Sequence, residues 1–433
     1  MVLGTRATRG TSAHLCGLGH DACSSRGQGA DVAATEVDFT VKTDSRIPLA
    51  QPVLGGNEWS YVRECLETGW VTSGRFIGLF EDLAQRVTGA SEVVACVSGT
   101  AALHVSLLLA DVEPGDEIIV PSVTFIAPVN AVRYVGAHPV FLGCDDFMNL
   151  DPTVLADFLD NECEHTHEGL RDRATGRLVR GVVPVHVFGN PCDMATIVEL
   201  CRRHQLALIE DACESMGSSW TGGPLAGRHT GTVGDYGAFS FNGNKIVTAA
   251  GGGMLVTRDP DQADRARYLI DQAKDDGVRY VHDSIGFNYR LSNVQAAIGA
   301  AQLEELPRFI ETHRRNHALY AEALDGVAGL RLLGVPDGTA PNYWFYSLLV
   351  EPAQFGIDRE TLMVALERDG IQTRPLWPPN HLQSPYRDCR AYRVERASWF
   401  WERVLNLPCS GDLTAADVRA VAAAIIAAGE AAP

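Results

Sequence analysis

The chain contains very little lysine. Of its 36 basic residues only three are lysines, Lys42, Lys245 and Lys274. A reaction that needs a lysine amine therefore has three candidates. Lys42 follows a stretch rich in Gly, Ala and Ser, and Lys274 lies in the charged stretch AKDDG, whereas Lys245 follows the two aromatics of FSFNGNK. Because a lysine that emerges from an apolar core is desolvated and held as a nucleophilic amine, we expect Lys245 to be the reactive one.

Further absences limit the class of protein. No run of about 18 apolar residues is present, which excludes a membrane-spanning helix. The net charge of −18 leaves no basic surface for the phosphates of a nucleic acid. The 11 cysteines are scattered without a CxxC pair. Since the chain does not begin with a signal-peptide pattern either, we expect reduced thiols and a cytoplasmic location.

Potential metal ligands occur close together in two places, within residues 14–23 and within residues 163–167. The first group lies in a leader that offers nothing to order the ligands, and the second lies in a polar stretch. We therefore predict no metal site.

The distribution of apolar residues indicates an α/β protein with a leader and two domains. Residues 1–40 have no apolar periodicity and are expected to be flexible. In 41–305, short β-rich runs such as EVVACV, DEIIVPS and LALIEDAC alternate with helical patterns, which is typical of a mostly parallel sheet covered by helices. Residues 306–433 predict a smaller α+β domain that begins with a helix near residue 310. Residues 160–180 predict a polar insertion or loop.

Two features at predicted strand ends point to ligand binding. Ser98-Gly99-Thr100 lies between a strand and a helix, where free backbone amides and a hydroxyl can hold an anion. The motif alone is weak, because many capped helices begin this way. Asp211 ends the run LALIE at the edge where open α/β sheets bind ligands, and it either caps the next helix or pairs with a protonated ring nitrogen. No GxGxxG fingerprint follows a strand, so a nicotinamide cofactor is not expected.

Together, a phosphate-binding turn, a strand-end aspartate and a lysine make up the protein's part of a pyridoxal 5′-phosphate site. From about Ile47 to its end the chain resembles the DegT/DnrJ/EryC1/StrS sugar aminotransferases, whose fold is the pyridoxal-phosphate-dependent transferase fold of type I. Six motifs in family order carry the resemblance: SGTAAL (98–103), PGDEIIVPSVTF (114–125), PVHVFGNPCDM (184–194), IEDACES (209–215), GAFSFNGNKIVTAAGGGM (237–254) and IGFNYRLSNVQAAIG (285–299). Residues 273–282 and 370–389 are most similar to LegC-type enzymes of legionaminic acid pathways, with perosamine synthases as close relatives.

The resemblance implies roles around the cofactor ring. Lys245 would bind the cofactor as a Schiff base, Asp211 would pair with the pyridinium nitrogen, and Phe125 would stack on the ring. Glu214 departs from the family pattern, which commonly has Gln or His at this position. Its contact with the ring hydroxyl is therefore in question.

The resemblance also implies a phosphate site shared between two subunits. Asn288 would reach the phosphate of the neighbouring subunit's cofactor, with Arg290 in support, so that a homodimer with shared active sites is expected. An alternative is that Asn288 only caps the helix that begins near Ser292. Within the same chain the phosphate would be held by Gly99, Thr100, the amide of Ala101 and Ser240.

The contacts to the substrate are less specific. His186 faces the substrate or is a packed histidine at a strand end, and both readings fit the pattern VPVHVFG. A Pro-rich segment of the 370–389 loop either binds the acceptor or has a structural role only. The candidate residues for substrate binding are Thr72, Ser73, His186, Arg374, Trp377 and His381.

The resemblance implies transamination of a nucleotide-linked keto-deoxy sugar in bacterial amino-sugar and surface polysaccharide biosynthesis. The expected acceptor is a UDP-linked 4-keto-6-deoxyhexose, and the expected amino donor is L-glutamate. Two alternatives share the fold: a pyridoxal-phosphate-dependent sugar dehydratase and a non-catalytic regulator. The dehydratases carry histidine where this chain has Lys245, and no DNA-binding appendage is visible, so a transaminase is favoured.

Overall fold

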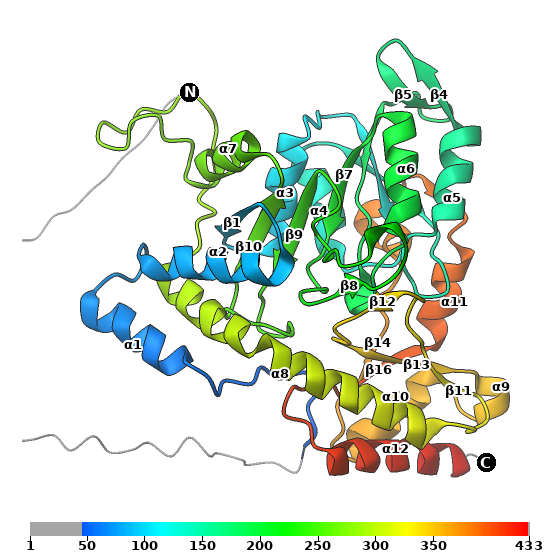
Figure 1. Cartoon of the computed structure of the whole chain (residues 1–433). Helices are drawn as coiled ribbons and strands as arrows, with labels where there is room; N and C mark the ends of the chain where they lie inside the picture. Colours follow the sequence, from blue (N-terminus) through cyan, green and yellow to red (C-terminus); the bar gives the residue numbers. More distant parts are fainter. Residues whose placement is uncertain (1–45, 432–433) are drawn as a thin grey trace, which may run out of the picture. The chain divides into compact units, whose positions relative to one another are not determined.

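The structure, a computed structural model that describes residues 46–431, is built on an eight-stranded sheet (Figure 1). β10 pairs antiparallel with β1 and β9, and the other neighbouring strands of this sheet are parallel. β2 and β10 are buried along their whole length, as expected for strands between two helix layers. The predicted α/β fold is confirmed. In spatial order the strands are β1 (Glu92–Cys96), β10 (Gly253–Thr257), β9 (Tyr236–Ser240), β7 (Ala207–Asp211), β6 (Val179–Val182), β2 (Glu117–Pro121), β3 (His138–Leu142) and β15 (Ala391–Tyr392).

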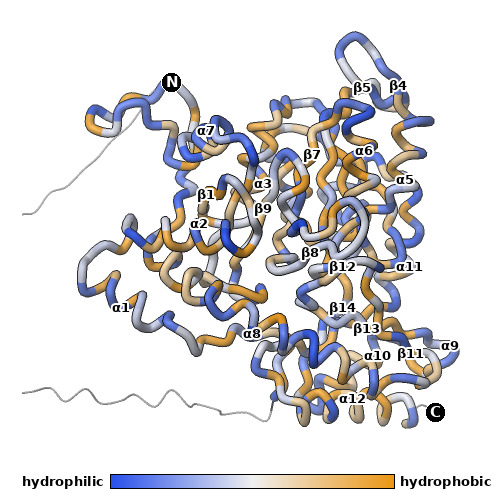
Figure 2. The backbone as a smooth tube through the Cα atoms, viewed as in Figure 1, coloured by the Kyte–Doolittle hydropathy of each residue, from blue (hydrophilic) through white to orange (hydrophobic). Residues whose placement is uncertain are grey.

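Helices cover both faces of this sheet and divide its core into separate apolar clusters. One cluster lies under α3 (Gly99–Leu109), α4 (Ile126–Tyr134) and α7 (Pro260–Ile270). A second lies under α5 (Pro152–Asp157) and α6 (Met194–His204). A third is enclosed by α1 (Glu58–Thr68), α2 (Arg75–Thr88) and the first half of α8 (Asn293–Leu324). Figure 2 shows hydrophobic colour concentrated along the central strands.

The C-terminal part forms a second, smaller sheet. Its strands are β11 (Leu330–Leu332), β13 (Tyr346–Val350), β16 (Val404–Leu407) and β14 (Arg374–Pro375), in that spatial order. An apolar cluster joins this sheet to α10 (Arg359–Arg368), α12 (Ala415–Glu430) and the second half of α8. The remaining helices of this part are α9 (Pro352–Phe355) and α11 (Glu395–Arg403), and β12 (Thr339–Ala340) pairs with β8 (Ser219–Trp220).

The structure corrects the sequence prediction in three places. Residues 160–180 contain a two-stranded hairpin, β4 (Cys163–Thr166) and β5 (Gly169–Asp172), rather than a loop. The helix expected near 310 begins at Asn293, and α2 was not predicted. The expected boundary at 305/306 falls inside α8 and stays a prediction. The predicted leader and Lys42 lie outside the described residues. Within 46–431, every helix is too short or too polar to cross a membrane.

Candidate active site

A cavity of about 510 Å³ lies beyond the C-terminal ends of the central strands. This is the edge at which open α/β sheets bind ligands. The turn between β1 and α3, the end of β7 and the segment after β9 all reach it, because each follows the end of a strand. Its lining includes nine residues predicted from sequence: Gly99, Thr100, Phe125, Asp211, Glu214, Ser240, Lys245, Arg374 and Trp377.

The start of α3 forms an anion-binding turn at one end of the cavity. The Ser98 hydroxyl caps the helix by accepting a hydrogen bond from the Ala101 amide at 3.1 Å. The Ala101 amide is therefore already used, which counts against its predicted phosphate contact. The amides of Gly99 and Thr100 belong to the first turn, where helical N–H groups have no partner within the helix. Ser240, at the end of β9, also lines the cavity there.

Gly99 leaves no room for a side chain at this turn. A Cβ atom on Gly99 would lie 2.5 Å from Cys213 Sγ and 2.9 Å from Ser240 Cβ. Overpacking of this kind costs about 1–3 kcal/mol. Because the atoms that must shift belong to the turn expected to hold the phosphate, we expect Gly99→Ala to weaken the affinity for a phosphate ligand by about 10-fold or more. Titration of the purified variant with pyridoxal 5′-phosphate, followed by absorbance, measures this loss.

Gly78 provides the matched control, because it lies in α2 and a Cβ there would meet nothing within 4 Å. Gly78→Ala should leave the affinity unchanged and stabilise the fold by about 0.5–1 kcal/mol. If Gly99→Ala and Gly78→Ala bound pyridoxal 5′-phosphate with equal affinity, the start of α3 would not be part of the phosphate site.

Asp211 ends β7 with its carboxylate buried beside the cavity. One carboxylate oxygen accepts a hydrogen bond from the Cys213 amide at 3.0 Å. Burial raises the pKa of Asp211, and the Cys213 amide and the charge of Lys245 act in the opposite direction. Among residues 46–431 no cationic side chain lies within ion-pair distance of it. A buried carboxylate without such a partner is suited to a cationic ligand group.

Lys245 reaches the cavity from the turn after β9. Its Nζ donates a hydrogen bond to Glu214 Oε1 at 3.3 Å and lies 3.9 Å from the centre of the Trp344 ring. The second Glu214 oxygen accepts a hydrogen bond from the Phe188 amide at 2.9 Å. Burial raises the pKa of Glu214, while Lys245 opposes that shift. By contrast, Lys274 forms a surface ion pair with Asp271 at 2.8 Å.

Aromatic side chains form one wall of the cavity. Trp377 lies between Phe188 and Phe125, with ring centres 4.7 and 6.0 Å away respectively. Phe125 is half exposed, so one face of its ring is available to a planar ligand. Arg374, in β14, is exposed on the same wall, and within residues 46–431 its guanidinium donates only to the Thr373 carbonyl.

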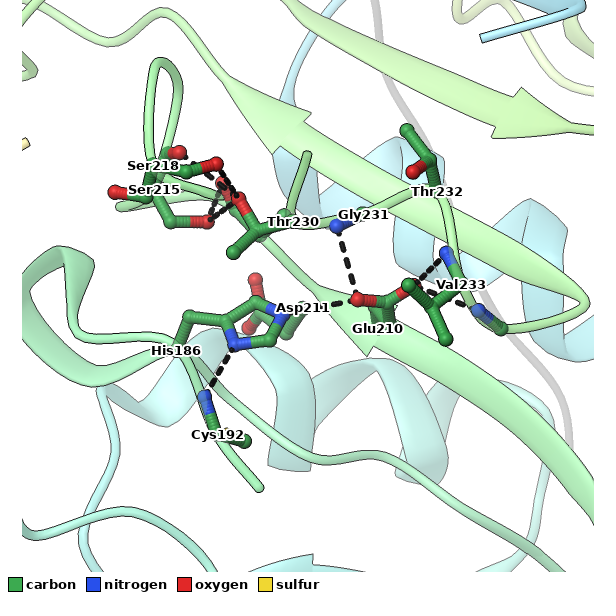
Figure 3. A network of polar contacts seen from close by, with 12 residues as sticks. His186, Cys192, Glu210, Asp211, Ser215, Ser218, Thr230, Gly231, Thr232 and Val233 are labelled. Carbon is green, nitrogen blue, oxygen red and sulfur yellow. Dashed lines mark hydrogen bonds and ion pairs between the residues drawn. The ribbon is translucent and has the colours of Figure 1, made fainter. Parts of the chain in front are cut away.

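The predicted substrate contact of His186 is wrong. Its side chain is fully buried and hydrogen-bonded to the Glu210 carboxylate at 3.0 Å, so it cannot touch a ligand in the cavity (Figure 3). The alternative reading, a packed histidine at a strand end, fits. His381 is also absent from the lining of the cavity. Its Nδ1 lies 2.7 Å from the Ser122 hydroxyl, which ties the 376–390 loop to the end of β2.

The remaining predicted residues lie away from the cavity of their own chain. Thr72 and Ser73 are in the turn between α1 and α2, where the Thr72 carbonyl accepts a hydrogen bond from the Asn293 amide. Asn288 is exposed, and α8 is capped by Ser292, so the capping alternative for Asn288 is wrong. Arg290 is paired with Asp271 at 3.4 Å. None of these four residues lines the cavity of its own chain.

Several lining residues were missed from the sequence. The Thr124 hydroxyl is buried without a hydrogen-bond partner in the described part of the chain, and it lies next to Phe125 in the motif PSVTF, from which it could have been proposed. Cys213 follows Asp211 by two residues, and burial raises its thiol pKa well above the ordinary range. Trp344 and Asn406 come from the second sheet region. Nothing in the local sequence connects them to the strand ends.

Known proteins similar to this chain share one chemistry. The profile of the DegT/DnrJ/EryC1/StrS aminotransferase family matches residues 52–426. A GDP-perosamine synthase of Caulobacter vibrioides is 37% identical over 88% of this chain and 97% of its own length. The crystal structure of the aminotransferase TlmJ from Streptoalloteichus hindustanus matches with a TM-score of 0.79 at 31% identity, over 88% of this chain and 98% of that one. DesI, crystallised with its TDP-sugar product, matches with a TM-score of 0.79 at 28% identity, over 90% and 94%.

Proposed function

Because the chain belongs to the DegT/DnrJ/EryC1/StrS aminotransferase family, we propose that it transfers an amino group from L-glutamate to a nucleotide-linked 4-keto-6-deoxyhexose. Its class, a pyridoxal-phosphate-dependent sugar aminotransferase, follows from the family. The observation that carries the proposal is the convergence of Lys245, Asp211 and the start of α3 on one cavity. These three come from separate strand ends.

The residues present fit pyridoxal 5′-phosphate. Asp211 is a buried carboxylate that lacks a cationic partner in the described chain, as a protonated ring nitrogen requires. Gly99 leaves open the space that a phosphate group needs at the first turn of α3. The Thr124 hydroxyl is an unpaired buried group beside the same cavity. The bound cofactor supplies an electron sink and a temporary carrier for the amino group.

Lys245 is placed to move protons during the reaction. Its amine lies at the cavity wall, held by Glu214 and by the face of the Trp344 ring. When free, this amine would take a proton as general base from the substrate carbon that carries the amino group, and would return it as general acid to the carbon of the cofactor. Glu214 holds the amine in place through one oxygen, because its other oxygen is fixed by the Phe188 amide. The aromatic wall excludes water from the amine.

Arg374 and Trp377 are proposed to bind the acceptor. A nucleoside diphosphate is anionic, whereas the protein carries a net charge of −18, so a local cation is needed at the entrance. Arg374 is exposed on the cavity wall without a carboxylate partner among the described residues. Trp377 offers a neighbouring aromatic face for the sugar or the base.

A screen of UDP-, GDP- and TDP-linked 4-keto-6-deoxyhexoses with L-glutamate tests the proposal. The Caulobacter relative is named for a GDP-sugar product, which favours GDP over the UDP expected from the sequence. The expected result is release of 2-oxoglutarate together with an amino sugar. A protein that binds the cofactor but never converts it to the pyridoxamine form with glutamate would contradict the proposal.

We further propose that the enzyme is a homodimer with shared active sites. Helix α1, the turn after it and the 278–285 segment expose large apolar side chains, among them Trp59, Trp70, Tyr280 and Ile285. Large apolar side chains exposed in this way are typical of a protein–protein interface. Asn288 follows this segment and does not line the cavity of its own chain, which supports its predicted role in the partner's site.

Mixing two inactive variants tests the shared site. In a symmetric dimer each chain both donates and receives Asn288. A mixed dimer of Lys245→Ala and Asn288→Ala chains therefore has one doubly altered site and one intact site, and we expect about half of wild-type activity. Dimers are purified with two different affinity tags and assayed for 2-oxoglutarate release.

The control is a mixed dimer of Lys245→Ala with the wild-type chain, which sets the activity of a single intact site. If Asn288 acts within its own chain, every mixed site carries one lesion. Activity no higher than that of the two parent homodimers would then overturn the shared site.

A further inference from the structure

A buried hydrogen-bond network lies directly behind Asp211. Neighbouring residues of a strand point to opposite faces, and Glu210 therefore faces away from the cavity that Asp211 lines. The Glu210 carboxylate is fully buried. It accepts hydrogen bonds from the amides of Gly231 at 2.9 Å, Val233 at 2.5 Å and Gly234 at 2.6 Å, and from His186 Nε2 at 3.0 Å (Figure 3). Burial alone would raise its pKa, but these donors outweigh burial and hold the pKa of Glu210 below its ordinary value.

His186 joins this carboxylate to the loop on the other side of β7. Its Nδ1 accepts a hydrogen bond from the Cys192 amide at 3.0 Å, so the ring proton is on Nε2 and is donated to Glu210. The main-chain amide of His186 donates to the Asp211 carbonyl at 3.1 Å, and the Asp211 amide donates to the Pro184 carbonyl at 2.9 Å. His186 therefore holds the backbone of Asp211 directly and through Glu210.

The segment after Asp211 is fixed by the same two loops. Thr230 precedes the amides that bind Glu210, and its hydroxyl lies 2.8 Å from the Ser215 hydroxyl and donates to the Ser215 carbonyl at 3.0 Å (Figure 3). On the other side, the Phe188 amide donates to Glu214. Glu210 and His186 thus lie where the loop 184–192, the loop 229–234 and the strand end meet.

We propose that His186 and Glu210 are positioning residues for Asp211, which set where its carboxylate lies relative to the ring nitrogen of the cofactor. This inference rests on the proposed function. A misplacement of about 1 Å at a reacting group costs on the order of 10²-fold in rate, so a fixed backbone at this strand end has a direct consequence for activity. A network that only stabilised the fold would affect unfolding but leave the bound cofactor unchanged.

Two substitutions of His186 separate its two hydrogen bonds. His186→Gln places an amide donor near Nε2 and keeps the bond to Glu210 but loses the acceptor for Cys192. His186→Asn places an acceptor near Nδ1 and keeps the bond to Cys192 but leaves Glu210 without its side-chain donor. His204→Asn is the matched control, because His204 is another buried histidine, at the end of α6, that does not contact the cavity.

Each variant is titrated with pyridoxal 5′-phosphate, its bound-cofactor absorbance spectrum is recorded, and the single-turnover reaction with glutamate is followed. We expect His186→Asn to weaken cofactor affinity about 5- to 10-fold and to slow the glutamate reaction about 10- to 50-fold, with less than a twofold change in the half-saturating glutamate concentration. His186→Gln should remain within about threefold of wild type, because it keeps the Glu210 bond. His204→Asn should lower the melting temperature only.

The proposal would be overturned if folded His186→Asn protein had the cofactor affinity, the absorbance spectrum and the reaction rate of the wild type. Equal impairment of the Gln and Asn variants would also overturn the assignment to the Glu210 bond. If the wild-type chain fails to react with glutamate, the proposed function fails, whereas cofactor affinity and spectrum still test the positioning role independently.

Discussion

Replacing Lys245 with alanine is expected to lower transaminase turnover by about 10⁴-fold or more and to abolish covalent attachment of the cofactor. The reason is that Lys245 is the one lysine of the described chain at the cavity, and Lys274 is held in a surface ion pair with Asp271. The Nζ atom lies between Glu214 and the Trp344 ring, where it is desolvated and oriented. The substitution removes both the proposed attachment point of the cofactor and the amine proposed to move the proton.

Borohydride reduction of the wild-type protein with bound cofactor, followed by peptide mapping, identifies the attached lysine. The control is Lys274→Arg, which keeps the surface ion pair but cannot form the covalent bond, and it should retain wild-type turnover. A pyridoxyl label on Lys42 or Lys274 would contradict the assignment. Non-covalent binding of the cofactor by Lys245→Ala checks that the variant is folded.

The central sheet and much of the candidate site could be predicted from the sequence because their signals are local. A buried strand is encoded by a short apolar run, such as EIIVP for β2, and the turn at its end contains Gly, Ser or Asp. Parallel strands end at one edge of the sheet. Asp211 and Lys245, which are 34 residues apart, could therefore be predicted to lie at the same site from the sequence.

What could not be predicted depends on contacts between distant segments. Whether His186 faces the cavity or the core depends on the rotation of the chain after β6, and the pattern VPVHVFG fits both. Its partner Glu210 lies 24 residues away. The other partners of Glu210 are backbone amides, and because every non-proline residue has such an amide, the sequence does not indicate which of them bind Glu210. Trp344 and Asn406 reach the cavity only because the second sheet packs against the first.

Glu214 is the position at which the sequence departs from the family pattern, and the structure shows its hydrogen-bond partners. From the sequence, a carboxylate in place of Gln or His left the contact with the ring hydroxyl in question. In the structure one oxygen of Glu214 is engaged by the Phe188 amide and the other by Lys245. These contacts support the proposal that Glu214 orients the lysine, and its contact with the ring hydroxyl stays a prediction.

Asp211→Asn is expected to retain the cofactor but to slow both half-reactions about 10²- to 10³-fold. The carboxylate is buried at the end of β7. In the proposed role its negative charge would stabilise a protonated ring nitrogen, and that positive charge would draw electrons away from the reacting carbon. Asparagine keeps the shape and the hydrogen bond from the Cys213 amide but carries no charge. Stopped-flow absorbance with glutamate measures the first half-reaction.

The control for this variant is at the other end of the same strand. Asp235 accepts a hydrogen bond from the Leu208 amide at 2.9 Å, near the start of β7, and its side chain is not part of the cavity. Asp235→Asn therefore removes a carboxylate that fixes β7 without touching the cofactor, and it should alter stability but leave the half-reaction rates within about twofold of wild type. Rates near wild type for Asp211→Asn would exclude Asp211 as the partner of the ring nitrogen. Slow rates in both variants would instead mean that the position of β7, rather than the charge at its end, limits the reaction.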